Sequence, residues 1–153
     1  MIRFERSTDY ELIREILTEP RCWRRMTGSR SRESGAKSQE PGAFQVGPLE
    51  GIEYVLARFD CAPAAVFLIE GRAALHFCFV PAFWGRSEAV ARGFIEWLWQ
   101  NTTAGLYKGH VPEHNRLALQ LAKRVGFTEK KTEGGSQESG DGRLIVLEIE
   151  RPC

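Results

Sequence analysis

Apolar residues either alternate with polar ones or recur at helical spacing along most of this chain. Ile2 and Phe4 alternate with polar neighbours, which predicts a short first strand. Thr8 and Glu11 have the spacing of a capping box, so we expect Thr8 to cap the helix that follows. The apolar face of that helix consists of Leu12, Ile13, Ile16 and Leu17.

The next part of the chain predicts a helix end and a long loop. Pro20 is expected to end the first helix, and a second short helix follows at residues 21–26. Residues 28–43 contain no large apolar side chain, which is typical of a mobile loop. A Gly- and Ser-rich segment at 133–142 predicts a second mobile loop. Neither loop is long enough to separate two domains, so we expect one domain over residues 1–153.

The remaining pattern predicts an antiparallel meander of three strands, followed by alternating helices and strands. A meander that leads into a β-α-β crossover predicts an α/β fold with a central mixed sheet and helices on both faces. The expected strands are residues 52–59, 65–69, 73–80, 106–111, 127–132 and 144–149, and the expected helices are residues 87–100 and 115–124.

Composition narrows the class of protein. With 153 residues, 42% of them hydrophobic, the chain can bury the core of one globular domain. The 21 basic and 20 acidic residues leave a net charge of +1, so we expect no nucleic-acid partner. No apolar stretch is long enough to span a bilayer and the first residues lack a secretion signal, so we expect a cytoplasmic protein with no membrane partner.

The four cysteines show no spacing typical of a metal site, so no metal is expected. Cys78 lies in an apolar run, which predicts a buried thiol. A disulfide among the other three, Cys22, Cys61 and Cys153, is left open.

Residues 75–89 carry the most informative chemistry. A strand enters a tight turn with Pro81 and Gly85 and then a helix start, which directs free N–H groups and a positive helix dipole at one point. Gly85 lets the backbone approach an anion, Arg86 adds a charge suited to phosphate, and Ser87 is placed to cap the helix. An ordinary strand–turn–helix corner explains the same residues.

Two motifs resemble the GNAT superfamily of acyl-CoA N-acyltransferases. The first is Val80-Pro81-x-Phe83-x-Gly85-Arg86, which is similar to the superfamily's pyrophosphate-binding segment. The second is Val111-Pro112-x-x-Asn115-x-x-Ala118-x-x-Leu121 with Gly126-Phe127, which is similar to the segment that ends the cofactor site. The motifs stand in the superfamily's order and separation, and with the order of elements the resemblance covers essentially the whole chain.

A narrower resemblance is to a GNAT-like group encoded in tailed-phage genomes. Some members of that group are named head-assembly proteins. The residues that carry this resemblance are His76, Pro81, Trp84-Gly85, Trp97-Leu98-Trp99-x-Asn101-Thr102 and Val111-Pro112-x-x-Asn115-x-x-Ala118.

The superfamily resemblance implies that the strands at 73–80 and 106–111 are parallel neighbours that splay apart around the pantetheine of acetyl-CoA. Three positions depart from the superfamily: Trp84 replaces Gln or Arg, Ser87 replaces Gly, and Ala122 replaces a Tyr that often serves as general acid. The implied cofactor-binding residues are Phe79, Val80, Trp84, Gly85, Arg86, Ser87, Glu88, Ala89 and Asn115.

Two residues are candidates for catalysis. His76 is predicted mid-strand on the same face as Cys78 and Val80, and superfamily general bases often sit on this strand. An imidazole suits this role because it titrates near neutral pH, although a histidine held at the core edge explains it equally. Tyr107 is the candidate general acid, and an aromatic that fills a strand face is the plainer interpretation.

These features imply an N-acyltransferase that moves an acetyl group from acetyl-CoA to an unknown primary amine by direct attack. The alternative is a non-catalytic GNAT-fold phage protein with a role in head assembly, which Trp84, Ser87 and Ala122 favour. A homodimer and a phage structural protein are both left open as partners, and a phage-encoded protein would lie in the host cytoplasm.

Overall fold

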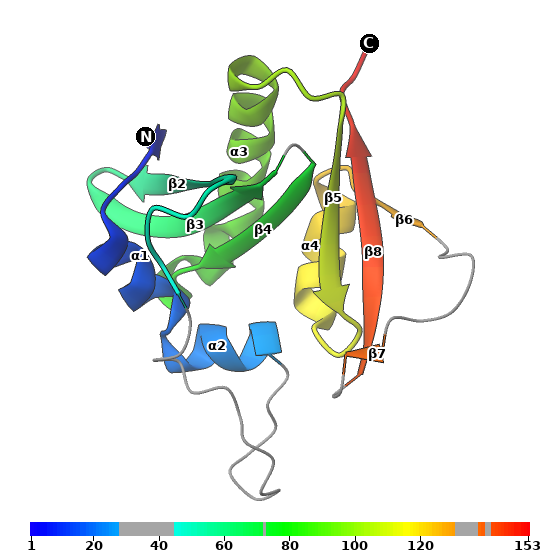
Figure 1. Ribbon diagram of the computed structural model, residues 1–153, viewed down its shortest axis with the longest axis horizontal. Coiled ribbons are helices and arrows are strands. Elements are labelled where there is room, and N and C mark those ends of the chain that lie inside the picture. The colour runs from blue at the N-terminus through cyan, green and yellow to red at the C-terminus, as the bar shows by residue number, and fades with distance from the viewer. Residues whose placement is uncertain (28–44, 72, 131–137, 140–141) are drawn as a thin grey trace, which may run out of the picture.

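The computed structural model describes residues 1–27, 45–71, 73–130, 138–139 and 142–153, and the elements within them build a mixed sheet flanked by helices (Figure 1). The order of the strands is β1-β2-β3-β4-β5-β8-β6, and β7 pairs with β8. The strands are β1 (Ile2–Arg6), β2 (Ile52–Phe59), β3 (Ala62–Glu70), β4 (Ala74–Phe79), β5 (Leu106–Pro112), β6 (Thr128–Lys130), β7 (Glu138–Ser139) and β8 (Gly142–Glu150). The helices are α1 (Tyr10–Leu17), α2 (Pro20–Thr27), α3 (Ser87–Asn101) and α4 (Arg116–Arg124), and η2 (Pro81–Arg86) is a 3₁₀ helix.

The mixed sheet contains the predicted splayed pair of parallel strands. β4 and β5 are parallel, whereas β1, β2, β3 and β4 form an antiparallel series and β5 pairs antiparallel with β8. β4 and β5 pair only at Ala74 with Lys108 and at Leu75 with Gly109. The two strands therefore separate over the rest of their length, which confirms the prediction for this pair.

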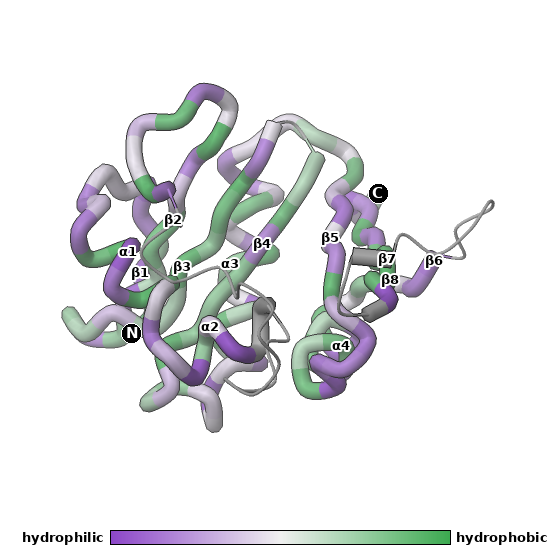
Figure 2. The backbone as a smooth tube through the Cα atoms, turned by 60° about the horizontal axis from the view of Figure 1, so that its bottom comes forward, coloured by the Kyte–Doolittle hydropathy of each residue, from purple (hydrophilic) through white to green (hydrophobic). Residues whose placement is uncertain are grey.

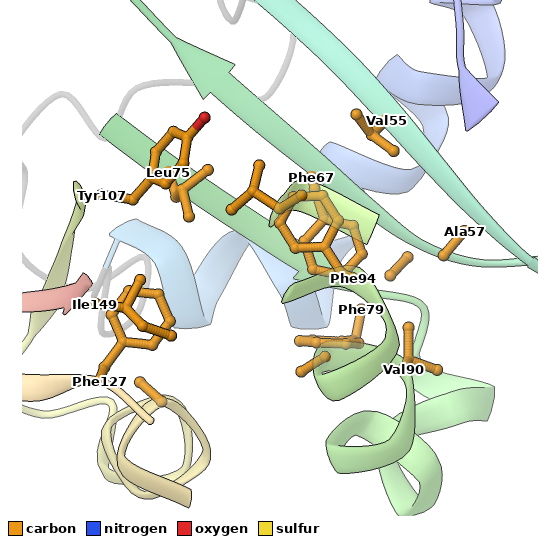
Figure 3. Packing of buried hydrophobic residues seen from close by; sticks show 14 of the residues in the cluster. Val55, Ala57, Phe67, Leu75, Phe79, Val90, Phe94, Tyr107, Phe127 and Ile149 are labelled. Atoms are coloured by element: carbon orange, nitrogen blue, oxygen red, sulfur yellow. The ribbon is translucent and has the colours of Figure 1, made fainter. Parts of the chain in front are cut away.

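Alternation along β3 explains why helices cover both faces of the sheet. Phe67 faces α3, where its ring stacks on Phe94 with centroids 3.8 Å apart and planes 8° apart (Figure 3). Val66 and Leu68 point the other way and pack in the same cluster as Ile13 of α1. β3 and β4 are accordingly largely hydrophobic in Figure 2, whereas α4 mixes hydrophobic and hydrophilic residues.

Local details correct several boundaries. Asp9 rather than Thr8 caps α1, because the Asp9 carboxylate accepts a hydrogen bond from the Leu12 N–H at 3.2 Å. Pro20 begins α2 instead of only ending α1, since a first-turn proline lacks an N–H that would have no acceptor there anyway. β3 starts at Ala62, before the predicted residue 65, because the turn needs only two residues with positive φ.

The two predicted mobile loops fall largely outside the described residues. Residues 28–43 lie wholly outside them. Within 133–142, Glu138 and Ser139 pair with Arg143 and Gly142, so part of that segment is strand rather than loop.

Arg151 holds the end of α3 to the start of β5. Its guanidinium donates to the backbone oxygens of Trp99 at 2.6 Å, of Thr102 at 2.6 Å and of Ala104 at 3.2 Å. It also lies 5.1 Å from the centroid of the Trp99 ring. The last carbonyls of a helix have no partner within the helix, so the Arg151 side chain supplies hydrogen-bond donors to carbonyls that would otherwise lack them.

Arg151→Met is expected to lower the free energy of unfolding by about 3 kcal/mol, because hydrogen bonds from a charged donor contribute roughly 1.5–3 kcal/mol each and these are only partly buried. Denaturant unfolding measures the change. The exposed Arg143 is the control, since Arg143→Met should change stability by less than about 0.5 kcal/mol. Equal losses in the two variants would contradict the assigned role of Arg151.

Candidate functional site

A cavity of about 340 Å³ lies beside the part of β4 that no longer pairs with β5. The end of β4, the η2–α3 junction and α4 form most of its wall, and α2 contributes Cys22. Figure 2 shows the two strands apart, with α2 near β4 and α4 near β5. Of the predicted cofactor-binding residues, those that line the cavity are Phe79, Trp84, Gly85, Ser87, Glu88 and Asn115, whereas Val80, Arg86 and Ala89 lie outside its lining.

The predicted tight turn is a 3₁₀ helix that continues into α3. Ser87 is the first residue of α3 and has helical dihedral angles, with φ −58° and ψ −36°. An N-cap residue needs a non-helical conformation, so the prediction that Ser87 caps the helix is wrong. Arg86 takes the cap position without a side-chain hydrogen bond to the helix. No side chain caps the first turn of α3, but the Ser87 N–H already donates to the Trp84 oxygen, so the helix start offers an anion chiefly its positive dipole.

Gly85 leaves room for a ligand beside this helix start. A Cβ atom at Gly85 would meet no other atom within 4 Å, and Gly85 lines the cavity. The absence of a side chain therefore keeps this part of the wall open to an approaching anion.

The positive charge at the cavity comes from a different residue than predicted. The Arg86 guanidinium lies over the Phe59 ring, 4.6 Å from its centroid, so its charge is not directed into the cavity. Arg124, at the end of α4, lines the cavity instead. Leu117, Leu121 and Arg124 follow helical spacing along α4 and all line the cavity, and this spacing is the signal in the sequence that marks Arg124.

A carboxylate already lies at the helix start. Glu88 lines the cavity in the first turn of α3. Its Oε1 accepts from Arg92 at 2.8 Å, and its Oε2 lies 3.8 Å from Arg124 Nη1. This carboxylate therefore competes with any phosphate for the same positive groups.

The carbonyl at the end of β4 is bonded from two sides. The Trp84 indole Nε1 donates to the Phe79 oxygen at 3.1 Å, and the Cys22 thiol donates to it at 3.2 Å. Arg21 lies 5.9 Å from the centroid of the Trp84 ring. Trp84, which stands where the superfamily prefers Gln or Arg, is thus bonded to the last residue of β4.

Asn115 caps α4, as predicted. Its side-chain oxygen accepts a hydrogen bond from the Ala118 N–H at 3.3 Å. The same residue lines the cavity, so it belongs to the helix start and to the cavity wall.

His76 lies at the point where the paired part of β4 ends. It follows Leu75, which is the last residue of β4 paired with β5. Its side chain is 44% exposed, and its Nε2 lies 3.0 Å from Glu70 Oε2. His76 lies outside the lining of the cavity, and its predicted catalytic role stays a prediction.

Tyr107 lies in the core beneath the paired part of β4 and β5. It is only 2% exposed, and its ring centroid is 5.6 Å from that of Trp99. Figure 3 shows it beside Leu75, and it does not line the cavity. Ala122 is also buried, and its methyl side chain has no hydroxyl that could act as a general acid. The role of Tyr107 as general acid stays a prediction.

Two further findings concern the described part of the chain. Its residues contain no group of three or more His, Cys, Asp or Glu that could hold a metal ion. None of the helices within the same residues is long and apolar enough to cross a membrane.

Comparison with known proteins identifies the fold. No family model and no curated protein matches the sequence. Solved structures match it, among them AAC(6')-Ib in complex with ribostamycin and coenzyme A, with a TM-score of 0.68 and 14% identity over 98% of this chain and 93% of that chain. The GNAT-family acetyltransferase from Streptococcus pneumoniae matches with a TM-score of 0.61 and 12% identity over 99% of this chain and 100% of that chain. The Campylobacter jejuni N-acetyltransferase PseH in complex with acetyl coenzyme A matches with a TM-score of 0.63 and 12% identity, also over 99% and 100% of the two chains.

At these identities the likeness shows the fold alone. The chain has the fold of the GNAT acetyltransferases, with the parallel, splayed β4–β5 pair that the sequence predicts.

Proposed function

We propose that this chain is an acyl-CoA-dependent N-acyltransferase that moves an acetyl group from acetyl-CoA to a primary amine. The observation that carries the proposal is the cavity between α4 and the part of β4 that has left β5, which reaches the start of α3. The likeness in fold to PseH, which is described in complex with acetyl coenzyme A, supports the choice of ligand.

We assign each end of the cofactor to a part of the cavity wall. The pantetheine arm would lie between β4 and β5, along Phe77 and Phe79. The pyrophosphate would lie at the first turn of α3, beside Gly85, with Arg124 of the same cavity wall as a counter-charge. An elongated anionic ligand fits this arrangement because the apolar strand edge leads directly to the positive helix start.

In the proposed reaction the acceptor amine attacks the thioester carbonyl. A C–N bond forms, the C–S bond breaks, and CoA leaves as a thiolate. A carboxylate only accepts hydrogen bonds, so Glu70 would hold the Nε2–H of His76 and leave Nδ1 to take the amine proton, directly or through a water molecule. A backbone N–H of β4 would bond the oxyanion of the tetrahedral intermediate.

Acetyl-CoA binding and acetyl transfer test the proposal in two stages. Acetyl-CoA at ~100 times its dissociation constant should stabilise the protein by roughly 2.7 kcal/mol, which a thermal melt detects. A panel of amines and peptides with labelled acetyl-CoA should then contain at least one acceptor. No shift at millimolar acetyl-CoA would refute the proposal.

A second candidate is a non-catalytic protein of this fold that acts in phage head assembly. The specific observation in its favour is that Trp84 and Cys22 already bond the Phe79 carbonyl, while Glu88 lies at the helix start. Tight acetyl-CoA binding without transfer to any acceptor would favour a non-catalytic protein over the enzyme.

Glu88→Gln is expected to strengthen acetyl-CoA binding by about fivefold, because the removal of one partly exposed like charge beside a phosphate is worth about 1 kcal/mol. The amide can still accept from Arg92, so the helix start should persist. Isothermal titration calorimetry measures the dissociation constants. Glu96→Gln, an exposed site on the same helix, is the matched control, and equal affinities for both variants would show that the phosphates do not approach Glu88.

A further inference from the structure

Two buried thiols meet in the cavity wall although they come from separate elements. Cys22 lies on α2 and Cys78 on β4, each is 4% exposed, and both line the cavity. Cys61 and Cys153 are exposed. The proposed acyl transfer uses none of these four thiols.

Hydrogen bonds make the two buried thiols chemically unequal. The Cys22 thiol donates to the Phe79 oxygen at 3.2 Å, and the Cys78 sulfur lies 3.8 Å from the Ile16 oxygen. A hydrogen bond from Cys78 lowers the pKa of the Cys22 thiol. The hydrogen bond to Cys22, together with burial, raises the pKa of the Cys78 thiol. Cys22 is therefore the thiol that ionises more readily, and a thiolate is the reactive form.

We propose that Cys22 and Cys78 form a redox-active dithiol site that a small hydroperoxide oxidises to a disulfide. The Cys22 thiolate attacks one oxygen of hydrogen peroxide, the O–O bond breaks, and a sulfenic acid and one water form. The Cys78 thiol then attacks the sulfur of that sulfenic acid, so that the S–S bond forms and a second water leaves. The two sulfurs lose two electrons and two protons in total, and the peroxide is reduced to two water molecules.

The cavity explains why a small oxidant is the matching reactant. Both thiols are shielded from the protein surface, yet they face a space that admits molecules larger than peroxide. Cys22 and Cys78 belong to one buried cluster, and the Cys22 thiol bonds the carbonyl of Phe79, the residue next to Cys78 in β4, so the two sulfurs start as neighbours for the second step. The site does not depend on acyl transfer, so a failure of the proposed function leaves it intact.

The test is a peroxide titration of the fully reduced protein, quenched with N-ethylmaleimide and mapped by peptide mass spectrometry. We expect a Cys22–Cys78 linked peptide, formed roughly tenfold or more faster than the oxidation of Cys61 and Cys153, since ionised and paired thiols react first. Dithiothreitol should reverse it. The same titration in guanidinium chloride should abolish the preference, because the pairing depends on the fold.

Variants assign the two roles. Cys78→Ser should leave a Cys22 sulfenic acid that dimedone traps, whereas Cys22→Ser should leave Cys78 reduced. The double variant Cys61→Ser with Cys153→Ser is the matched control and should form the link unchanged. Two results in the wild-type protein would overturn the proposal. One is a first disulfide that contains Cys61 or Cys153. The other is a Cys22–Cys78 pair that stays reduced while the exposed thiols oxidise.

Discussion

Replacing His76 with alanine is expected to lower the turnover of acetyl transfer by roughly 10²–10⁴-fold, because a positioned general base contributes about that factor. His76 lies next to the point where β4 and β5 separate, and Glu70 holds its Nε2 at 3.0 Å. The side chain lies outside the cavity lining, so the dissociation constant of acetyl-CoA should stay unchanged. Steady-state transfer assays on the wild type and the variant measure the effect.

Two further variants separate catalysis from structure. Glu70→Gln removes the charge that orients His76 and should lower turnover less than the loss of the imidazole itself. His110→Ala, an exposed histidine on β5, is the matched control and should leave turnover unchanged. Because the His76–Glu70 pair is exposed, its loss should cost less than about 1 kcal/mol of stability. A His76→Ala variant that melts earlier but transfers acetyl at the wild-type rate would assign the residue to the fold alone.

Gly85→Asp is expected to remove the thermal stabilisation by acetyl-CoA completely, a loss of roughly 2.7 kcal/mol at ~100 times the wild-type dissociation constant. A side chain at this position would point into open space in the cavity, so the carboxylate would meet the phosphates by contact and by like charge. Thermal melts with and without acetyl-CoA measure the shift.

Two glycine variants control for size and for charge. Gly85→Ala adds only a methyl group where no atom lies within 4 Å, so it should retain most of the shift. Gly47→Asp places the same charge at another glycine with open space, outside the cavity lining, and should retain the shift in full. If Gly85→Asp keeps the wild-type shift, the cofactor does not bind against the η2–α3 junction.

The sequence predicted the fold well because local periodicity reports which faces are buried. Residues 65–69 are apolar without a break, which fits a central strand with helices on both faces, and the β-α-β crossover makes β4 and β5 parallel. Cap positions were less certain because neighbouring residues compete for them. Asp9 rather than Thr8 is the N-cap of α1, and Ser87 is the first residue of α3 instead of its N-cap because η2 runs directly into α3.

The sequence by itself determined the elements, the splayed strand pair and the part of the cavity wall formed by Gly85, Ser87 and Glu88, since these depend on residues close together in the chain. Only the tertiary structure decided which charge faces the cavity. The Arg86 guanidinium lies over the Phe59 ring, whereas Arg124, at the end of α4, lines the cavity. It also brought Cys22 to Cys78, because a thiol pair across α2 and β4 depends on how a helix packs on a sheet, and no local spacing encodes that contact.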